Sequence, residues 1–173
     1  AAACGNARTP VPDVRAPQAP RGERSVDLPA AGVHFAAPAN WNGIRPEGPL
    51  VGGIESRRAT LAVWRYPRTE PLPRTRAELR RVRDLLIERV RLRDPTFELA
   101  HSRLARRAQA PAVELTGAQA ILGRRVRVRS AHVFRDGVEV VVDAYAPPRD
   151  FDRLDRAVFL PALRSLRVGP AGS

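Results

Sequence analysis

The chain has 173 residues, of which 43% are hydrophobic, a size and composition sufficient for one domain with its own core. Its 30 basic side chains are all arginine and face 18 acidic ones, which leaves a formal charge of +12. Nucleic-acid surfaces usually mix arginine with lysine, so this charge does not by itself predict a nucleic-acid partner. No segment after the N-terminal region approaches the roughly 18 consecutive apolar residues that a membrane-spanning helix needs.

The only cysteine, Cys4, follows three alanines and precedes a glycine. Small residues before a cysteine end the signal peptide of bacterial lipoproteins, in which the cysteine thiol is acylated after cleavage. The chain contains no methionine, so we expect that a segment before Ala1 has been removed. The pattern predicts lipidation of Cys4 and an extracytoplasmic location at the cell membrane. The alternatives are an unmodified thiol or one half of an intermolecular disulfide, since a single cysteine cannot form an internal one.

The segment that follows the cysteine is rich in proline and poor in apolar periodicity, with Pro10, Pro12, Pro17 and Pro20 among small and polar residues. Such a composition is typical of an extended linker with a rise of about 3.1 Å per residue. We therefore expect a lipid-anchor remnant and linker over residues 1–24, one folded domain over 25–168, and a tail over 169–173.

Three strands are predicted in the first part of the domain. A short run over 33–36 ends in a turn in which Asn40 adopts a left-handed backbone and directs Trp41 back under the sheet. Two apolar runs over 50–55 and 60–66, separated by three polar residues, predict a hairpin.

A helix is predicted from residue 76 to about residue 93. Thr75 and Glu78 have the spacing of a capping box, and the sequence Asp94-Pro95 ends the apolar periodicity. The outer face is rich in arginine, which could indicate a basic docking face. Asp84 and Glu88 lie among these arginines, so we expect an ordinary solvated face instead.

Further strands are predicted over 96–106, 112–117, 124–134 and 138–146, and the last two form a hairpin. We expect a three-residue loop over 135–137 that pairs Phe134 with Val138 and leaves one face apolar. A two-residue loop, Asp136-Gly137, would mix valines with charges on both faces, which a half-buried sheet does not favour. The chain then predicts a last helix from about residue 150, interrupted near Leu160 by Pro161.

Three features of this order resemble the PsbP/Mog-like fold, as found in actinobacterial lipoproteins of the LpqN type. They are the turn from Pro38 to Trp41, the hairpin around Asp136-Gly137 with its strand end at residues 144–147, and the closing helix before Ser165. The likeness covers residues 31–168. It departs from the family at Asn40, where glycine is usual, and at Leu166, where an aromatic residue is common.

The resemblance implies an α+β domain in which an antiparallel sheet of about six strands is packed by one long central helix and a C-terminal helix. It also implies a protein-interaction or assembly module, because known members mostly lack enzymatic activity.

No pattern for catalysis, cofactors or metals stands out. No serine lies in a Gly-x-Ser-x-Gly elbow, and Gly52-Gly53 lacks the surroundings of a phosphate-binding loop. The three histidines, His34, His101 and His132, come from separate predicted strands without ligand spacing. His132 is expected to be a hydrogen-bonded core histidine. We therefore expect no enzyme activity, cofactor or metal.

Alternation along the strand at 124–134 places Arg125, Arg127 and Arg129 on one sheet face. One interpretation is a solvated face neutralised by Glu139 and Asp143. The other is a surface for an anionic partner such as lipid head groups, a wall polymer or an acidic protein.

The sequence thus predicts a non-enzymatic cell-envelope lipoprotein that binds a protein partner or helps to assemble a complex. The alternative is a binder of an anionic polymer, lipid head groups or a small ligand. A deep pocket between the sheet and the helix would favour the ligand carrier, whereas a flat exposed face would favour protein docking.

Overall fold

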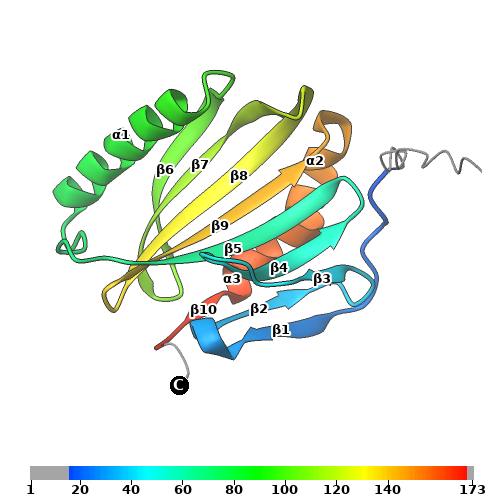
Figure 1. The fold of residues 1–173 in the computed structure, drawn as a ribbon, viewed down its shortest axis with the longest axis horizontal. Helices are drawn as coiled ribbons and strands as arrows, with labels where there is room; N and C mark the ends of the chain where they lie inside the picture. Colours follow the sequence, from blue (N-terminus) through cyan, green and yellow to red (C-terminus); the bar gives the residue numbers. More distant parts are fainter. Residues whose placement is uncertain (1–15, 171–173) are drawn as a thin grey trace, which may run out of the picture.

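The computed structural model describes residues 16–170, and Cys4 lies outside them. The described chain forms two antiparallel sheets with helices against them (Figure 1). The seven-stranded sheet has the order β3 (Asn42–Ile44), β4 (Leu50–Ser56), β5 (Ala59–Pro67), β9 (Val138–Ala146), β8 (Arg124–Arg135), β7 (Ala110–Ile121) and β6 (Glu98–Arg107). The smaller one has the order β1 (Arg24–Leu28), β2 (Val33–Ala37) and β10 (Arg167–Val168). The α+β class is confirmed, but the single sheet of about six strands is wrong.

The sequence missed the second sheet because its outer strands give weak signals. β1 has one buried residue, Val26, and β10 has only two residues, which pair with Val33 and His34 of β2. The 3₁₀ turn η1 (Pro29–Ala31) joins β1 to β2. No run of alternating apolar residues long enough to predict a strand is present in either segment.

The turn after β2 buries Trp41 as predicted, but not by the predicted route. Asn40 is not among the residues with positive φ, so the left-handed backbone expected there is wrong. Its side chain holds the turn instead: Oδ1 accepts the N–H of Arg21 at 2.8 Å, and Nδ2 donates to the carbonyl of Ala19 at 3.0 Å. The ring of Trp41 is buried and meets Phe159 edge to face.

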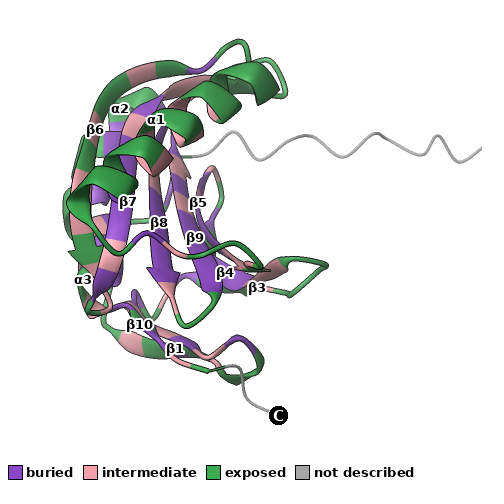
Figure 2. Ribbon diagram, turned by 90° about the vertical axis from the view of Figure 1, so that its left-hand side faces the viewer, coloured by how far each residue is buried: buried purple, intermediate pink, exposed green. Residues whose placement is uncertain are grey.

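Helix α1 (Arg76–Arg93) begins at the predicted capping box. Thr75 Oγ1 accepts the N–H of Glu78 at 3.1 Å, while Glu78 Oε2 accepts the N–H of Thr75 at 2.9 Å. The expectation of a long central helix is wrong, because α1 lies over β6 and β7 at one edge of the sheet. Leu79 packs there with Val113, Leu115 and Phe134, and Figure 2 shows exposed positions along the outer side of α1.

The hairpins form over the predicted runs. β4 and β5 pair as expected, with a shorter turn at Arg57-Arg58. The register of β8 and β9 differs from the prediction, since Arg135 pairs with Val138 and Phe134 with Glu139. The turn is therefore Asp136-Gly137, with φ of 49° and 76° at its two residues, as a type I′ turn requires.

The two-residue loop mixes valines with charges on both faces, as expected, but buried residues lie on both faces. The face that carries Val140, Val142 and Ala144 packs on the C-terminal helices and the smaller sheet. The opposite face is covered at one side by α1. Because each face carries buried residues, the strands need not separate apolar from polar residues by face, so the argument from a half-buried sheet fails here.

The C-terminal segment runs through α2 (Pro148–Leu154), a π-helical turn η2 (Asp155–Phe159) and α3 (Leu160–Ser165). The irregularity predicted near Leu160 therefore lies just before Pro161. The N–H of Leu160 reaches back to the carbonyl of Asp155. Phe151, Leu154 and Phe159 are buried in the main core against the sheet. No helix in residues 16–170 is both long enough and apolar enough to cross a membrane.

Candidate functional site

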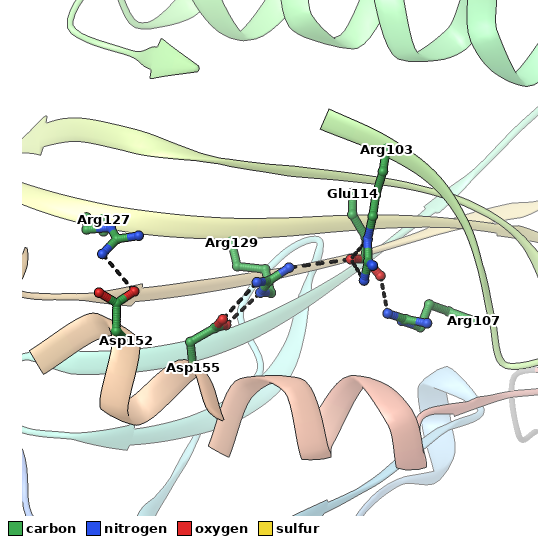
Figure 3. A network of polar contacts seen from close by, with 7 residues as sticks. All are labelled: Arg103, Arg107, Glu114, Arg127, Arg129, Asp152 and Asp155. Atoms are coloured by element: carbon green, nitrogen blue, oxygen red, sulfur yellow. Dashed lines mark hydrogen bonds and ion pairs between the residues drawn. The ribbon is translucent and has the colours of Figure 1, made fainter. Parts of the chain in front are cut away.

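The three arginines singled out from the sequence do share one face of β8, and Figure 3 shows two of them directed at the C-terminal helices. Arg127 donates to Asp152 at 2.8 Å and lies over the ring of Phe151, 4.5 Å from its centroid. Arg125 pairs with Glu98 at 2.5 Å. The neutralising residues are therefore not Glu139 and Asp143, which lie on the opposite face.

Arg129 is the most buried of the three, with 13% of its side chain exposed against 59% for Arg125. It binds Asp155 through two nitrogens at 2.6 and 2.8 Å and reaches Glu114 at 3.4 Å. The carboxylate of Glu114 is buried and also accepts from Arg103 at 2.6 Å (Figure 3). Arg107 lies 2.5 Å from Glu114 Oε1 as an ion pair without hydrogen-bond geometry. This network joins β6, β7, β8 and η2.

Binding of an anionic partner by Arg125, Arg127 and Arg129 stays a prediction. Their contacts with Glu98, Asp152 and Asp155 are internal and account for the charge of each guanidinium. A partner would have to compete with these pairs.

A cleft of about 650 Å³ lies on the other face of the sheet, beside α1. Aromatic and aliphatic side chains line it from five elements, including Trp64 and Tyr66 of β5, Leu86 of α1, and Val141 of β9. Its volume falls in the range of sites for small molecules, about 300–1,000 Å³. The cleft is thus a pocket between helix and sheet, the feature expected of a ligand carrier and not of a flat docking surface.

A buried polar chain forms the floor of the cleft. His132 Nδ1 donates to Glu139 Oε1 at 2.6 Å, and Arg68 pairs with the other oxygen of the same carboxylate. Burial, together with the charges of Arg93 and Arg68, lowers the pKa of His132 to about 4. The imidazole is therefore neutral at pH 7, and Nε2 accepts from Ser130 Oγ at 3.2 Å. His132 is a hydrogen-bonded buried histidine, as predicted.

A second polar pair lies beside this chain. The hydroxyl of Tyr145 donates to Asp143 Oδ2 at 3.2 Å. Burial raises the pKa of Asp143, and its polar contacts with Ser130 and Tyr145 partly oppose that shift. Burial and the nearby Asp143 also raise the pKa of Tyr145. These groups offer a ligand hydroxyl both acceptors and donors inside a pocket that polar and apolar side chains line together.

Ser130 contacts His132, and His132 contacts Glu139. The hydroxyl, imidazole and carboxylate of a serine hydrolase are linked in the same order. Two properties of the floor differ from such a site. A histidine with a pKa near 4 is a weak general base at neutral pH. Both β8 and β9 have a paired strand on each side, so their backbone N–H groups donate within the sheet rather than to an oxyanion.

Arginines from α1 line the open side of the cleft. Arg89 and Arg93 are exposed, and neither forms an ion pair with a residue in 16–170. Arg93 lines the cleft together with His132, Asp143 and Tyr145, and its positive charge lowers the pKa of each of them. The cleft therefore joins a cationic rim to a polar floor and aromatic walls.

The structure keeps the other histidines apart. His34 contacts Asp27 and Ser25 on the smaller sheet, and His101 is exposed on β6. Within residues 16–170 no three or more His, Cys, Asp and Glu side chains are grouped to hold a metal ion.

No family model and no curated protein matches the sequence. Solved structures match the fold. Cyanobacterial PsbP (CyanoP) from Synechocystis sp. PCC 6803 aligns with a TM-score of 0.65 and 14% identity, over 85% of this chain and 92% of that one. LpqN, involved in cell envelope biogenesis of Mycobacterium tuberculosis, aligns at 0.61 and 16%, over 86% and 91%. PA94 of Pseudomonas aeruginosa, a protein of unknown function, aligns at 0.56 and 17%, over 79% and 92%.

At these identities the comparisons show the fold alone. The domain has a PsbP-like fold, as the resemblance implied. The comparisons do not show that the chain is a lipoprotein of the LpqN type or that it comes from an actinobacterium.

Sequence reasoning missed the cleft because it depends on the register of one hairpin. With the two-residue loop, Ser130 pairs with Asp143 and His132 with Val141, which brings the polar floor onto one face. In this register both faces of β8 and β9 mix polar with apolar residues. Such mixing is unfavourable in a half-buried sheet, so the sequence favoured the three-residue loop instead of the two-residue loop that forms.

Proposed function

We propose that this domain is a non-enzymatic binding module of the cell envelope that holds a small acidic ligand in the cleft beside α1. The observation that carries the proposal is the cleft itself, with unpaired Arg89 and Arg93 at its rim and a buried polar floor within the described residues 16–170. Of the two functions that the sequence predicts, the cleft favours the ligand carrier over the protein-docking or assembly module.

The chemistry of the lining narrows the ligand. Guanidinium groups at the rim favour a carboxylate or phosphate. Asp143 and Ser130 on the floor favour hydroxyl groups, and the rings of Trp64 and Tyr66 favour a flat or cyclic body. A hydroxylated ring that carries one acidic group, such as a sugar acid or a sugar phosphate, meets all three demands.

The envelope location belongs to the same proposal. It is supported by the alanines before Cys4 and by the fold shared with LpqN, a protein involved in cell envelope biogenesis. Lipidation of Cys4 is tested by mass spectrometry of the protein from bacterial membranes, in which an acylated N-terminal cysteine is expected. An unmodified thiol would contradict the anchor without affecting the cleft.

The cleft is tested by NMR titration with glucuronate and glucose 6-phosphate, with glucose as the uncharged control. We expect saturable shifts at cleft residues for the two acids and at least tenfold weaker binding in Arg93→Gln. Arg91→Gln changes an exposed arginine on α1 that does not line the cleft and should bind normally. Equal responses to all three sugars, or no response to any, would contradict the proposal.

The non-enzymatic assignment has its own test. The 173-residue protein is expected to hydrolyse p-nitrophenyl acetate no faster than Ser130→Ala does. A clear excess in the unmodified protein, abolished in Ser130→Ala and His132→Asn, would show that the floor acts as a nucleophile and base.

A further inference from the structure

One end of the molecule exposes a leucine in a strained backbone. Leu122 and Gly123 form the two-residue turn between β7 and β8, and Leu122 has a φ of 50°. Left-handed backbone is disfavoured for a branched side chain, and glycine or asparagine usually takes this position. Leu122 is nevertheless 97% exposed and packs on nothing within residues 16–170. Neither turn geometry nor packing explains a leucine here.

A second exposed leucine lies at the same end. Leu92, in the last turn of α1, is 75% exposed. The hydroxyl of Thr96, just after α1, accepts the N–H of Ala120 at 2.9 Å, which ties the end of this helix to the end of β7. Figure 1 shows the end of α1 and the β7–β8 turn together at the top of the molecule.

The charge around these leucines is positive. Arg91 and Arg124 are exposed, and no ion pair holds either of them within residues 16–170. Of the nearby carboxylates, Glu98 pairs with Arg125, and Asp94, which accepts a hydrogen bond from Thr96, is the one that stands against these two arginines. Glu88 lies one turn before Leu92 on α1, so the positive surface is confined to the helix end and the β7–β8 turn.

The described chain also starts from this end of the strands. Arg57, in the β4–β5 turn, donates to the carbonyl of Ala16 at 2.8 Å. That turn and the β7–β8 turn lie at the same end, since β5 and β8 both run antiparallel to β9. Cys4 precedes Ala16 by 12 residues, a span of at most about 40 Å when fully extended.

We propose that this end, defined by Leu92, Ile121, Leu122, Arg91 and Arg124 and called here the tip surface, rests on an anionic lipid bilayer. Leu122 enters the headgroup region, while the arginines meet acidic headgroups. Exposed apolar side chains flanked by basic ones are the pattern of a weak interfacial contact. The proposal is independent of the cleft.

Co-sedimentation with vesicles tests the tip surface. The protein is the full chain with Cys4→Ser, so that no acyl group contributes. We expect binding to vesicles of phosphatidylcholine with a quarter phosphatidylglycerol, little binding to pure phosphatidylcholine, and a decline with added salt. Leu122→Ser and Arg124→Glu should each weaken partitioning at least tenfold. Leu85→Ser, at an exposed leucine earlier on α1, and Arg164→Glu on α3 should bind as the parent does.

A dye at the tip provides a second measurement. Leu122→Cys in the Cys4→Ser background leaves one thiol for an environment-sensitive fluorophore, whose emission should shift to the blue with the acidic vesicles. No partitioning, equal partitioning to both lipids, or unchanged binding of Leu122→Ser would overturn the proposal. Self-association lost in Leu122→Ser, without vesicle binding, would also overturn it and assign the surface to a second copy of the chain.

Discussion

His132 is buried in the floor of the cleft, and this environment favours the neutral form of its imidazole. Burial and the charges of Arg93 and Arg68 lower its pKa to about 4, against about 6.5 in an unfolded chain. Between these values the unfolded state binds a proton that the folded state does not, so the free energy of unfolding falls as the pH falls from 6.5 to 4. Relative to His132→Asn, the protein should lose about 3 kcal/mol between about pH 7 and pH 4.

Urea unfolding at several pH values measures this difference. Asparagine can keep the donor to Glu139 and does not titrate. Comparison with the variant also removes the effect of Asp143, whose raised pKa stabilises the protein towards low pH and so acts with the opposite sign. A stability difference that stays constant over this pH range would show that His132 is not responsible.

Glu114 is the single buried carboxylate contacted by Arg103, Arg107 and Arg129. Removing one partner of a buried ionic network leaves the others uncompensated, which typically costs about 3–5 kcal/mol. Because Arg103 is half-exposed and water reaches it, we expect Glu114→Gln to lower the free energy of unfolding by about 3 kcal/mol.

The matched control is Glu98→Gln, which breaks the exposed pair with Arg125. That pair contributes little to stability because both side chains are exposed and solvent screens their charges. Chemical unfolding of both variants gives the comparison. Equal small losses would mean that Glu114 is not the centre of the network.

At the scale of elements, local signals predicted most of the fold. The capping box at Thr75 fixed the start of α1, and alternation located the hairpin runs of β4 with β5 and β8 with β9. Register was not predictable from one strand pair, because it depended on what covers each face. That information comes from α1 and the C-terminal helices, which are distant in sequence.

The turn between β8 and β9 allows the left-handed backbone at Gly137 to be tested. Gly137 has a φ of 76° and open space on the side where a Cβ would stand, so an added methyl group is opposed by backbone strain alone. We expect Gly137→Ala to cost about 1 kcal/mol of unfolding free energy. Gly43 of β3 also has open space but no positive φ, and Gly43→Ala should change stability by less than about 0.5 kcal/mol. Similar effects of the two substitutions would contradict the assigned turn.

At the scale of the molecule, the packing of two sheets against each other could not be predicted from the sequence. β10 reaches the smaller sheet only after α3, and no local pattern in Arg167–Val168 indicates a strand. The cleft has the same origin, because its walls come from β5, α1, β7, β8 and β9 and meet only in the folded chain. Long-range pairing decides both features, and neither leaves a periodic trace in one segment.

Arg65 is a polar side chain that joins the two sheets. It extends from β5 of the larger sheet and donates to the carbonyls of Ala31, at 2.5 Å, and Gly169, at 3.1 Å, beside the smaller one. Without it these carbonyls lose a charged donor, a change worth about 1.5–3 kcal/mol. Arg65→Ala should therefore destabilise the protein by about 2 kcal/mol and raise amide exchange in β2 and β10 before it affects β8 and β9. Arg164→Ala, an exposed arginine on α3, serves as the control. Uniform acceleration across both sheets would instead show that they unfold as one unit and that Arg65 does not set the boundary between them.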